Sequence, residues 1–161
     1  MFRKGILMII REYQPEDAKH LWDLFFNTVR NVNIQHYSQA QVEAWAPSEF
    51  SMEVWQNKMD NIRPFVVELE GVVVGYTDLQ ESGLIDHFFC HHEYQGRGVG
   101  RQLMSHVLNL AKQQGLIRVF SEVSITARPF YEHFGFSVVN EQTIEVRGQT
   151  MNNFVMEKLL D

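Results

Sequence analysis

The sequence is poor in cysteine, in basic residues and in long apolar runs. Cys90 is its single cysteine, so no internal disulfide can form, and we expect a reducing, cytoplasmic location. Fourteen Lys and Arg against twenty Asp and Glu give a net charge of −6, which argues against nucleic acid because phosphate contacts need a basic face. No run approaches the roughly 18 apolar residues of a membrane span, so we expect no membrane partner.

The amino-terminal segment has the outline of a signal peptide, with Arg3 and Lys4 ahead of an apolar stretch. That stretch is only about five residues long, below the roughly 7–15 of a secretory signal, and Arg11 follows at once. We therefore expect residues 7–12 to form a first strand of a soluble protein.

Aromatic residues are abundant, with 12 Phe, 5 Tyr and 3 Trp, so we expect a dense core and an aromatic-lined pocket. Apolar residues at helical spacing predict helices over residues 15–30, 40–46, 51–59 and 127–134, and one that leaves a glycine loop at residue 100 and ends near Gly115. Ser38 and Gln41 form a capping-box pattern for the second of these. Strands are predicted over residues 7–12, 65–69, 72–79, 84–90 and 118–123, with a final hairpin turning at Arg147 and Gly148. The order of these helices and strands along the chain predicts one mixed α/β domain over residues 1–161, without repeat or linker.

Alternating glycines follow the strand predicted at residues 84–90. Gly96, Gly98 and Gly100 can bring backbone N–H groups and a helix N-terminus close to a phosphate, and Arg97 and Arg101 add positive charge. A Walker loop would need Lys-Ser or Lys-Thr after its last glycine, and a dinucleotide fingerprint would need a glycine at Arg101. Neither motif matches, so a ligand-free turn and another phosphate ligand remain as alternatives.

The pattern Gln95-x-x-Gly98-x-Gly100 resembles the pyrophosphate-binding signature of the GNAT acetyltransferase superfamily. The residues before it, 85–94, resemble the strand that precedes this loop in the family, and residues 127–136 resemble its second signature, a short helix with a tyrosine followed by Gly-Phe. The resemblance covers nearly the whole chain. It implies a twisted, mostly antiparallel sheet of about six or seven strands, splayed between the fourth and fifth and flanked by about four helices. It also implies acetyl-coenzyme A as the co-substrate, without a metal.

The same resemblance assigns the residues that bind the cofactor. The loop residues Gln95, Gly96, Arg97, Gly98, Val99, Gly100 and Arg101 would hold the pyrophosphate. The backbone of Phe89 and Cys90 would pair with the pantetheine arm, and the Cys90 N–H would polarise the acetyl carbonyl. Ser124 stands where many members carry an asparagine that contacts this arm.

Tyr131 matches the family's tyrosine and is the expected general acid, because a phenol with a pKa of about 10 can protonate a departing thiolate. Leu84 stands where many members of the family carry a glutamate that acts as the general base. Asp86 would share its strand face, as the base, as an ammonium counter-ion, or as a mere surface carboxylate. His87 would face the other way and be structural. His91 and His92 would point to opposite sides of an extended segment, which argues against a metal site.

The acceptor should lie between the first two helices and the terminal strands, where Phe26, Asn27, His36, Tyr37 and Trp45 are candidates. Each could instead be a core residue. The expected reaction is attack of a primary amine, on a small molecule or a peptide, upon acetyl-coenzyme A in a ternary complex. A binding module without efficient transfer is the alternative, and the missing glutamate favours it. A homodimer is left open.

Overall fold

The computed structural model describes residues 7–161, so Arg3 and Lys4 of the amino-terminal segment lie outside the described residues. The helices are α1 (Ala18–Asn31), α2 (Gln39–Trp45), α3 (Met52–Ile62), α4 (Val99–Gln113) and α5 (Arg128–His133), with short 3₁₀ turns at Pro15–Asp17 and Asn33–Gln35. The strands are β1 (Met8–Glu12), β2 (Phe65–Leu69), β3 (Val72–Thr77), β4 (Leu84–Ile85), β5 (Phe88–Cys90), β6 (Arg118–Ser124), β7 (Ser137–Val146) and β8 (Gln149–Leu159). None of the helices in this part of the chain is both long and apolar enough to cross a membrane.

Local signals set most of these boundaries as the sequence predicts. Ser38 caps α2 by accepting a hydrogen bond from the Gln41 N–H, and the Gln41 side-chain Oε1 accepts one from the Ser38 N–H, which completes the capping box. Helix α3 runs three residues further than residues 51–59 suggested. It ends where Arg63 takes a left-handed φ of 45°, directly before a proline.

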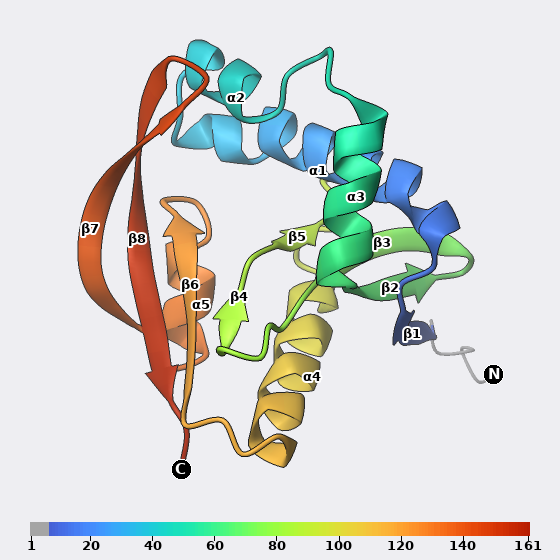
Figure 1. Cartoon of the computed structure of the whole chain (residues 1–161), viewed down its shortest axis with the longest axis vertical. Helices are drawn as coiled ribbons and strands as arrows, with labels where there is room; N and C mark the ends of the chain where they lie inside the picture. Colours follow the sequence, from blue (N-terminus) through green and yellow to red (C-terminus); the bar gives the residue numbers. More distant parts are fainter. Residues whose placement is uncertain (1–6) are drawn as a thin grey trace, which may run out of the picture.

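The strands form two four-stranded sheets, in the orders β1-β2-β3-β5 and β4-β6-β8-β7 (Figure 1). Every neighbouring pair is antiparallel except β4 and β6, which run parallel. Beyond β4 the sheets diverge, because β5 pairs with β3 while β6 pairs with β8. The mixed α/β architecture with a splayed sheet is confirmed, with eight strands and five α-helices in the described residues.

The prediction of one continuous strand over residues 84–90 is wrong. Asp78 lies buried at the end of β3, and its Oδ1 accepts backbone hydrogen bonds from Asp86 (3.0 Å) and His87 (2.7 Å). These two N–H groups are thereby taken out of the strand ladder, and the chain passes from one sheet to the other at this point. Alternation of side chains does not continue through the break. The Asp86 carboxylate bonds Lys58 and the His87 ring lies 5.9 Å from the Trp55 ring, so both side chains face α3, contrary to the expectation that they point to opposite sides.

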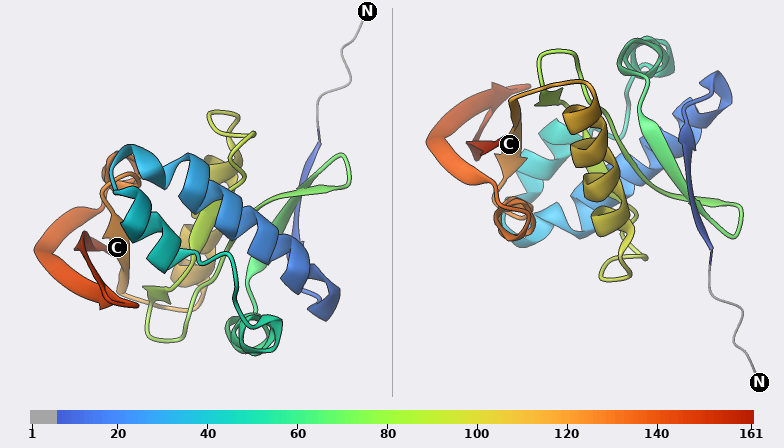
Figure 2. Two further views of the ribbon diagram at one scale, coloured as in Figure 1. Left: turned by 90° about the horizontal axis from the view of Figure 1, so that it is seen from above. Right: turned by 90° about the horizontal axis from the view of Figure 1, so that it is seen from below.

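Helices α1 and α4 cover opposite faces of the first sheet (Figure 2). Val66 and Tyr76 point toward α1, whereas Val67 and Val74 point toward α4. Val74 and Tyr76 face opposite sides although they are two residues apart, because the register between β2 and β3 shifts at Val67 and Glu68. Gly75 lets α4 approach, since a Cβ there would lie 2.7 Å from a Val99 methyl carbon. This close packing fixes the N-terminus of α4 beside the end of β5.

Candidate active site

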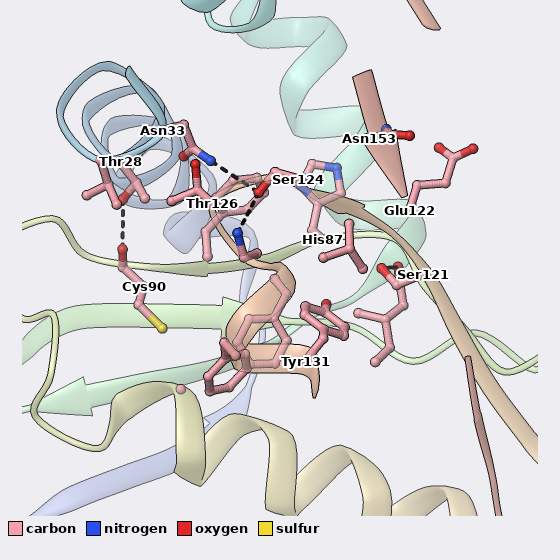
Figure 3. A pocket seen from close by; sticks show the side chains of 18 of the residues that line it. Thr28, Asn33, His87, Cys90, Ser121, Glu122, Ser124, Thr126, Tyr131 and Asn153 are labelled. Atoms are coloured by element: carbon pink, nitrogen blue, oxygen red, sulfur yellow. Dashed lines mark hydrogen bonds between the residues drawn. The ribbon is translucent and has the colours of Figure 1, made fainter. Parts of the chain in front are cut away.

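A cleft of about 970 Å³ lies where the sheets diverge, between β5 on one side and β6 with α5 on the other (Figure 3). Its lining includes the end of α1, the glycine loop, Tyr131 and part of β8. Cys90 and Tyr131 come from the two sides of the gap. The cleft is large enough for an extended ligand and its reaction partner.

The glycine loop meets the cleft through the start of α4. Gly96 and Gly98 have φ of 71° and 86°, and a Cβ on either would meet no atom within 4 Å, so their conformation rather than crowding requires glycine. Gly100 differs, because its Cβ would lie 2.9 Å from the Phe130 ring. The first hydrogen bond of α4 runs from the Gln102 N–H to Gly98 O. The N–H groups of residues 99–101 therefore precede the helical ladder and are available to an anion.

The polar side chains of the loop divide into two roles. The Gln95 amide donates to Cys90 O (2.9 Å) and ties the loop to the end of β5. Arg101 lines the cleft, and the Arg97 guanidinium lies 5.0 Å from the centre of the Tyr94 ring. Within residues 7–161 neither arginine has a carboxylate partner, so both charges are available to a phosphate.

The backbone of β5 offers an N–H group to the cleft. The His91 N–H bonds Val74 O (2.8 Å), and Cys90 lies directly opposite Gly75 in the register of β3 and β5. Because antiparallel strands alternate bonded and non-bonded pairs, the Cys90 N–H points away from β3, into the gap. Cys90 O is held by the Thr28 hydroxyl (2.8 Å). Burial raises the pKa of the Cys90 thiol to about 12, so it stays protonated near neutral pH.

Tyr131 comes from α5 and is buried, with 3% of its surface exposed, at the cleft wall. Burial raises the pKa of its phenol above the ordinary value of 10, and the nearby Ser121 hydroxyl offsets part of that rise. The phenol is therefore a proton donor throughout the neutral range. Its position across the gap from Cys90 is consistent with protonation of a leaving group between them (Figure 3).

Comparison with known proteins supplies the family. Residues 33–158 match the model of the acetyltransferase (GNAT) domain. This chain belongs to the GNAT acetyltransferase family. The acetyltransferase is 36% identical to YafP, an uncharacterised N-acetyltransferase of Escherichia coli K12, over 147 residues that make up 91% of this chain and 93% of YafP. The family and this relative identify the chain as an acyltransferase.

Solved structures agree with the fold. A GCN5-related N-acetyltransferase from Rhodopseudomonas palustris superposes with a TM-score of 0.91 at 26% identity, covering 99% of this chain and 100% of that one. The PaiA N-acetyltransferase of Thermoplasma acidophilum, solved with coenzyme A, gives a TM-score of 0.74 at 18% identity over 96% of this chain and 100% of its own. The second likeness concerns the fold alone.

Asp86 lies in the lining of the acetyltransferase cleft, but its carboxylate is bonded to Lys58 (2.5 Å) of α3. His87 is next to it, among aromatic rings, with its Nδ1 3.1 Å from the Tyr76 hydroxyl. Burial lowers the pKa of His87 to about 4, so the imidazole is neutral near pH 7. The structure therefore brings a paired carboxylate and a neutral histidine to the break in the strand.

The predicted acceptor residues differ in how close to the cleft they lie. Tyr37 and Trp45 line the cleft. His36 lies near its edge, where Nδ1 is 2.9 Å from the Thr126 hydroxyl of the lining. Phe26 packs under the Arg30 guanidinium, and the Asn27 amide donates to the Asp23 carbonyl of its own helix, so neither is among the lining residues.

Ser124 lines the cleft at the end of β6. Its hydroxyl accepts from the Ala127 N–H (3.0 Å), which stabilises the approach to α5, and from the Asn33 amide (3.4 Å). Asn33 and Thr28 are buried polar cleft residues that sequence reasoning missed. Each comes from a separate turn or helix, and no motif in the chain marks either of them.

The expectation that His91 and His92 point to opposite sides is wrong. Their rings stack with centroids 4.7 Å apart, because the strand ends at Cys90 and the backbone turns. Within residues 7–161 no three His, Cys, Asp or Glu side chains gather in a way that could hold a metal ion.

Proposed function

We propose that this acetyltransferase moves the acetyl group of acetyl-coenzyme A to a primary amine of a small molecule or peptide, by direct attack in a ternary complex. The observation that carries the proposal is the cleft itself, which is lined by the N-terminus of α4 at one end and, further in, by Cys90 and Tyr131 from its two sides. Coenzyme A in the PaiA structure, a protein of the same fold, supports the choice of donor.

In this proposal the pyrophosphate lies on the N–H groups of residues 99–101, beside Gly96 and Gly98, with Arg97 and Arg101 supplying charge. The pantetheine arm follows the free edge of β5, and Ser124 faces it from β6. The acetyl oxygen accepts from the Cys90 N–H, which stabilises the negative charge that develops on it.

The neutral amine attacks the carbonyl carbon, so a C–N bond forms and the C–S bond breaks. Tyr131 gives its proton to the departing sulfur and regains one from solvent, while the proton of the attacking nitrogen passes to a base. The high pKa of the Cys90 thiol supports direct transfer, because a protonated thiol is a poor nucleophile for an acetyl-enzyme route.

Asp86 is the proposed base, or the group that binds the incoming ammonium. Its ion pair with Lys58 means that an ammonium must compete with, or join, a cation already present. Partial exposure of both side chains leaves room for such an exchange, since 33% of the Asp86 side chain is exposed.

The test is release of coenzyme A thiol from acetyl-coenzyme A, measured against a panel of aliphatic, aromatic and polycationic amines and peptides. The proposal expects amine-dependent release that saturates with at least one class. Cofactor-dependent stabilisation without amine-dependent release from any class would favour the alternative, a module that binds acetyl-coenzyme A without efficient transfer.

A further inference from the structure

A second hollow of about 280 Å³ lies against the cleft. Five aromatic side chains from α1, α2, α3 and the segment before α3 line it, and we call it the aromatic hollow. These side chains are Trp22, Phe25, Trp45, Phe50 and Trp55. Lys58 and Arg147 complete its edge. The reaction proposed above does not use it.

The aromatic hollow and the cleft are neighbours with a common wall. Phe25, Trp45 and His87 line both. His87 stands at the break in the strand, four residues after Gly83 and three before Cys90, whose N–H points into the cleft. The hollow and the cleft therefore adjoin at these three residues, and a molecule that occupies both must pass beside them.

The rings of the hollow are held in fixed mutual positions. Trp22 stacks on Phe50 with centroids 5.1 Å apart and an angle of 11°, and meets Trp55 edge-on at 5.0 Å. Such walls favour a flat apolar group. An apolar cavity of about 150 Å³ holds benzene, so the 280 Å³ hollow has room for one ring or a fused pair.

The charges at the edge narrow the ligand further. Arg147 donates to Ala44 O (2.8 Å) and lies 5.2 Å from the centre of the Phe50 ring, and no carboxylate in residues 7–161 pairs with it. Lys58 is matched by Asp86 alone. The edge therefore carries an excess of positive charge, which opposes a second ammonium on a bound molecule.

We infer that the acceptor is an aromatic primary amine with one positive charge, its ring seated in the aromatic hollow and its amine passing His87 into the cleft. This inference rests on the proposed acetyl transfer and names its substrate class. The same features disfavour polyamines and aminoglycosides, which carry several positive charges and no aromatic body.

The first test compares initial rates of thiol release for 2-phenylethylamine, n-butylamine and spermidine with the intact protein. We expect kcat/KM for phenylethylamine to exceed that for butylamine by about tenfold or more, in line with the value of filling an apolar pocket, and spermidine to be the poorest. A higher kcat/KM for spermidine or butylamine would overturn the inference.

The second test uses Val54→Glu, with Met52→Glu as the matched control. Both are exposed apolar residues in the first turn of α3, at 55% and 41%, but only Val54 lines the hollow. Val54→Glu should raise KM for phenylethylamine by about tenfold and leave the acetyl-coenzyme A affinity unchanged, while Met52→Glu changes neither. Equal KM values for phenylethylamine in the two variants would place the ring elsewhere.

The two levels of the account fail differently. If neither thiol release nor cofactor-dependent stabilisation occurs, the proposed transfer itself is wrong. If acetyl-coenzyme A binds and transfer occurs to spermidine or butylamine in preference, only the aromatic acceptor is wrong. Binding of acetyl-coenzyme A without transfer to phenylethylamine also overturns the aromatic acceptor.

Discussion

The two ends of the cleft are built in different ways. The proposed donor end consists of backbone N–H groups of the consecutive residues 99–101, which follow the glycine loop, and of the edge of β5. The proposed acceptor end consists of side chains that α1, α2, α3 and the β7–β8 turn bring together from distant parts of the chain. A backbone site needs glycine and geometry, whereas a side-chain site depends on the identity of each residue.

This difference implies that the two ends can be altered separately. A change at the glycine loop should remove the cofactor without touching the aromatic rings, and a change in the aromatic hollow should affect the amine alone. Tyr131 and Cys90 lie between these ends, so a change there should lower turnover with both ligands still bound.

The largest expected effect is loss of cofactor binding in Gly98→Glu. The substitution puts a negative charge beside the pyrophosphate site and a side chain on a φ of 86°, which costs roughly 1–3 kcal/mol of backbone strain. Gly115→Glu is the matched control, because Gly115 has a φ of 74°, equally open surroundings and a position beyond the far end of α4. Calorimetric titration with acetyl-coenzyme A should detect binding only in the control. Similar affinities in both variants would move the phosphates away from the loop.

Next in size is the effect of Tyr131→Phe on turnover. Removal of a general acid costs about 10²-fold or more in kcat, and the acetyl-coenzyme A affinity should stay nearly intact because the ring remains. Tyr13→Phe is the control, since its hydroxyl bonds Asp60 (2.7 Å) on α3 rather than facing the cleft. Steady-state kinetics of thiol release measures both, and an unchanged kcat in Tyr131→Phe would remove this residue as the acid.

The smallest expected effect concerns Asp78, which holds the break between the two halves. Burial raises its pKa from 3.8 to about 6, so between these values the folded protein binds a proton that the unfolded chain has released. Its contribution to stability therefore falls as pH rises from about 4 to 6. His87, with a pKa lowered to about 4, acts in the opposite direction over nearly the same range, so the two largely cancel in the intact protein.

Asp78→Asn should remove the Asp78 contribution and leave that of His87. Relative to the intact protein, its free energy of unfolding should gain roughly 2–3 kcal/mol between pH 4 and pH 7, because one pKa unit corresponds to about 1.4 kcal/mol. Urea unfolding at a series of pH values measures the difference. Parallel curves for the two proteins would show that Asp78 titrates as it does in the unfolded chain.

The conformation of the glycine loop was predictable from sequence, and the aromatic hollow was not. Gly96 and Gly98 indicate a backbone with positive φ, because few other residues adopt it, and Ser38 with Gln41 indicates the start of a helix. The break at Asp86 was missed, because it depends on a carboxylate eight residues earlier that no local pattern connects to it. No local pattern connects Trp22 with Phe50, and only folding places them around one hollow.

The central claim, that this acetyltransferase binds acetyl-coenzyme A at the glycine loop, is tested most directly by the melting temperature of the intact protein during titration with this ligand. A ligand that binds only the folded state stabilises it by about 2.7 kcal/mol at 100 times its Kd. We predict a melting temperature that rises steadily with acetyl-coenzyme A and does not rise in Gly98→Glu. A constant melting temperature for the intact protein up to high ligand concentration would contradict the account.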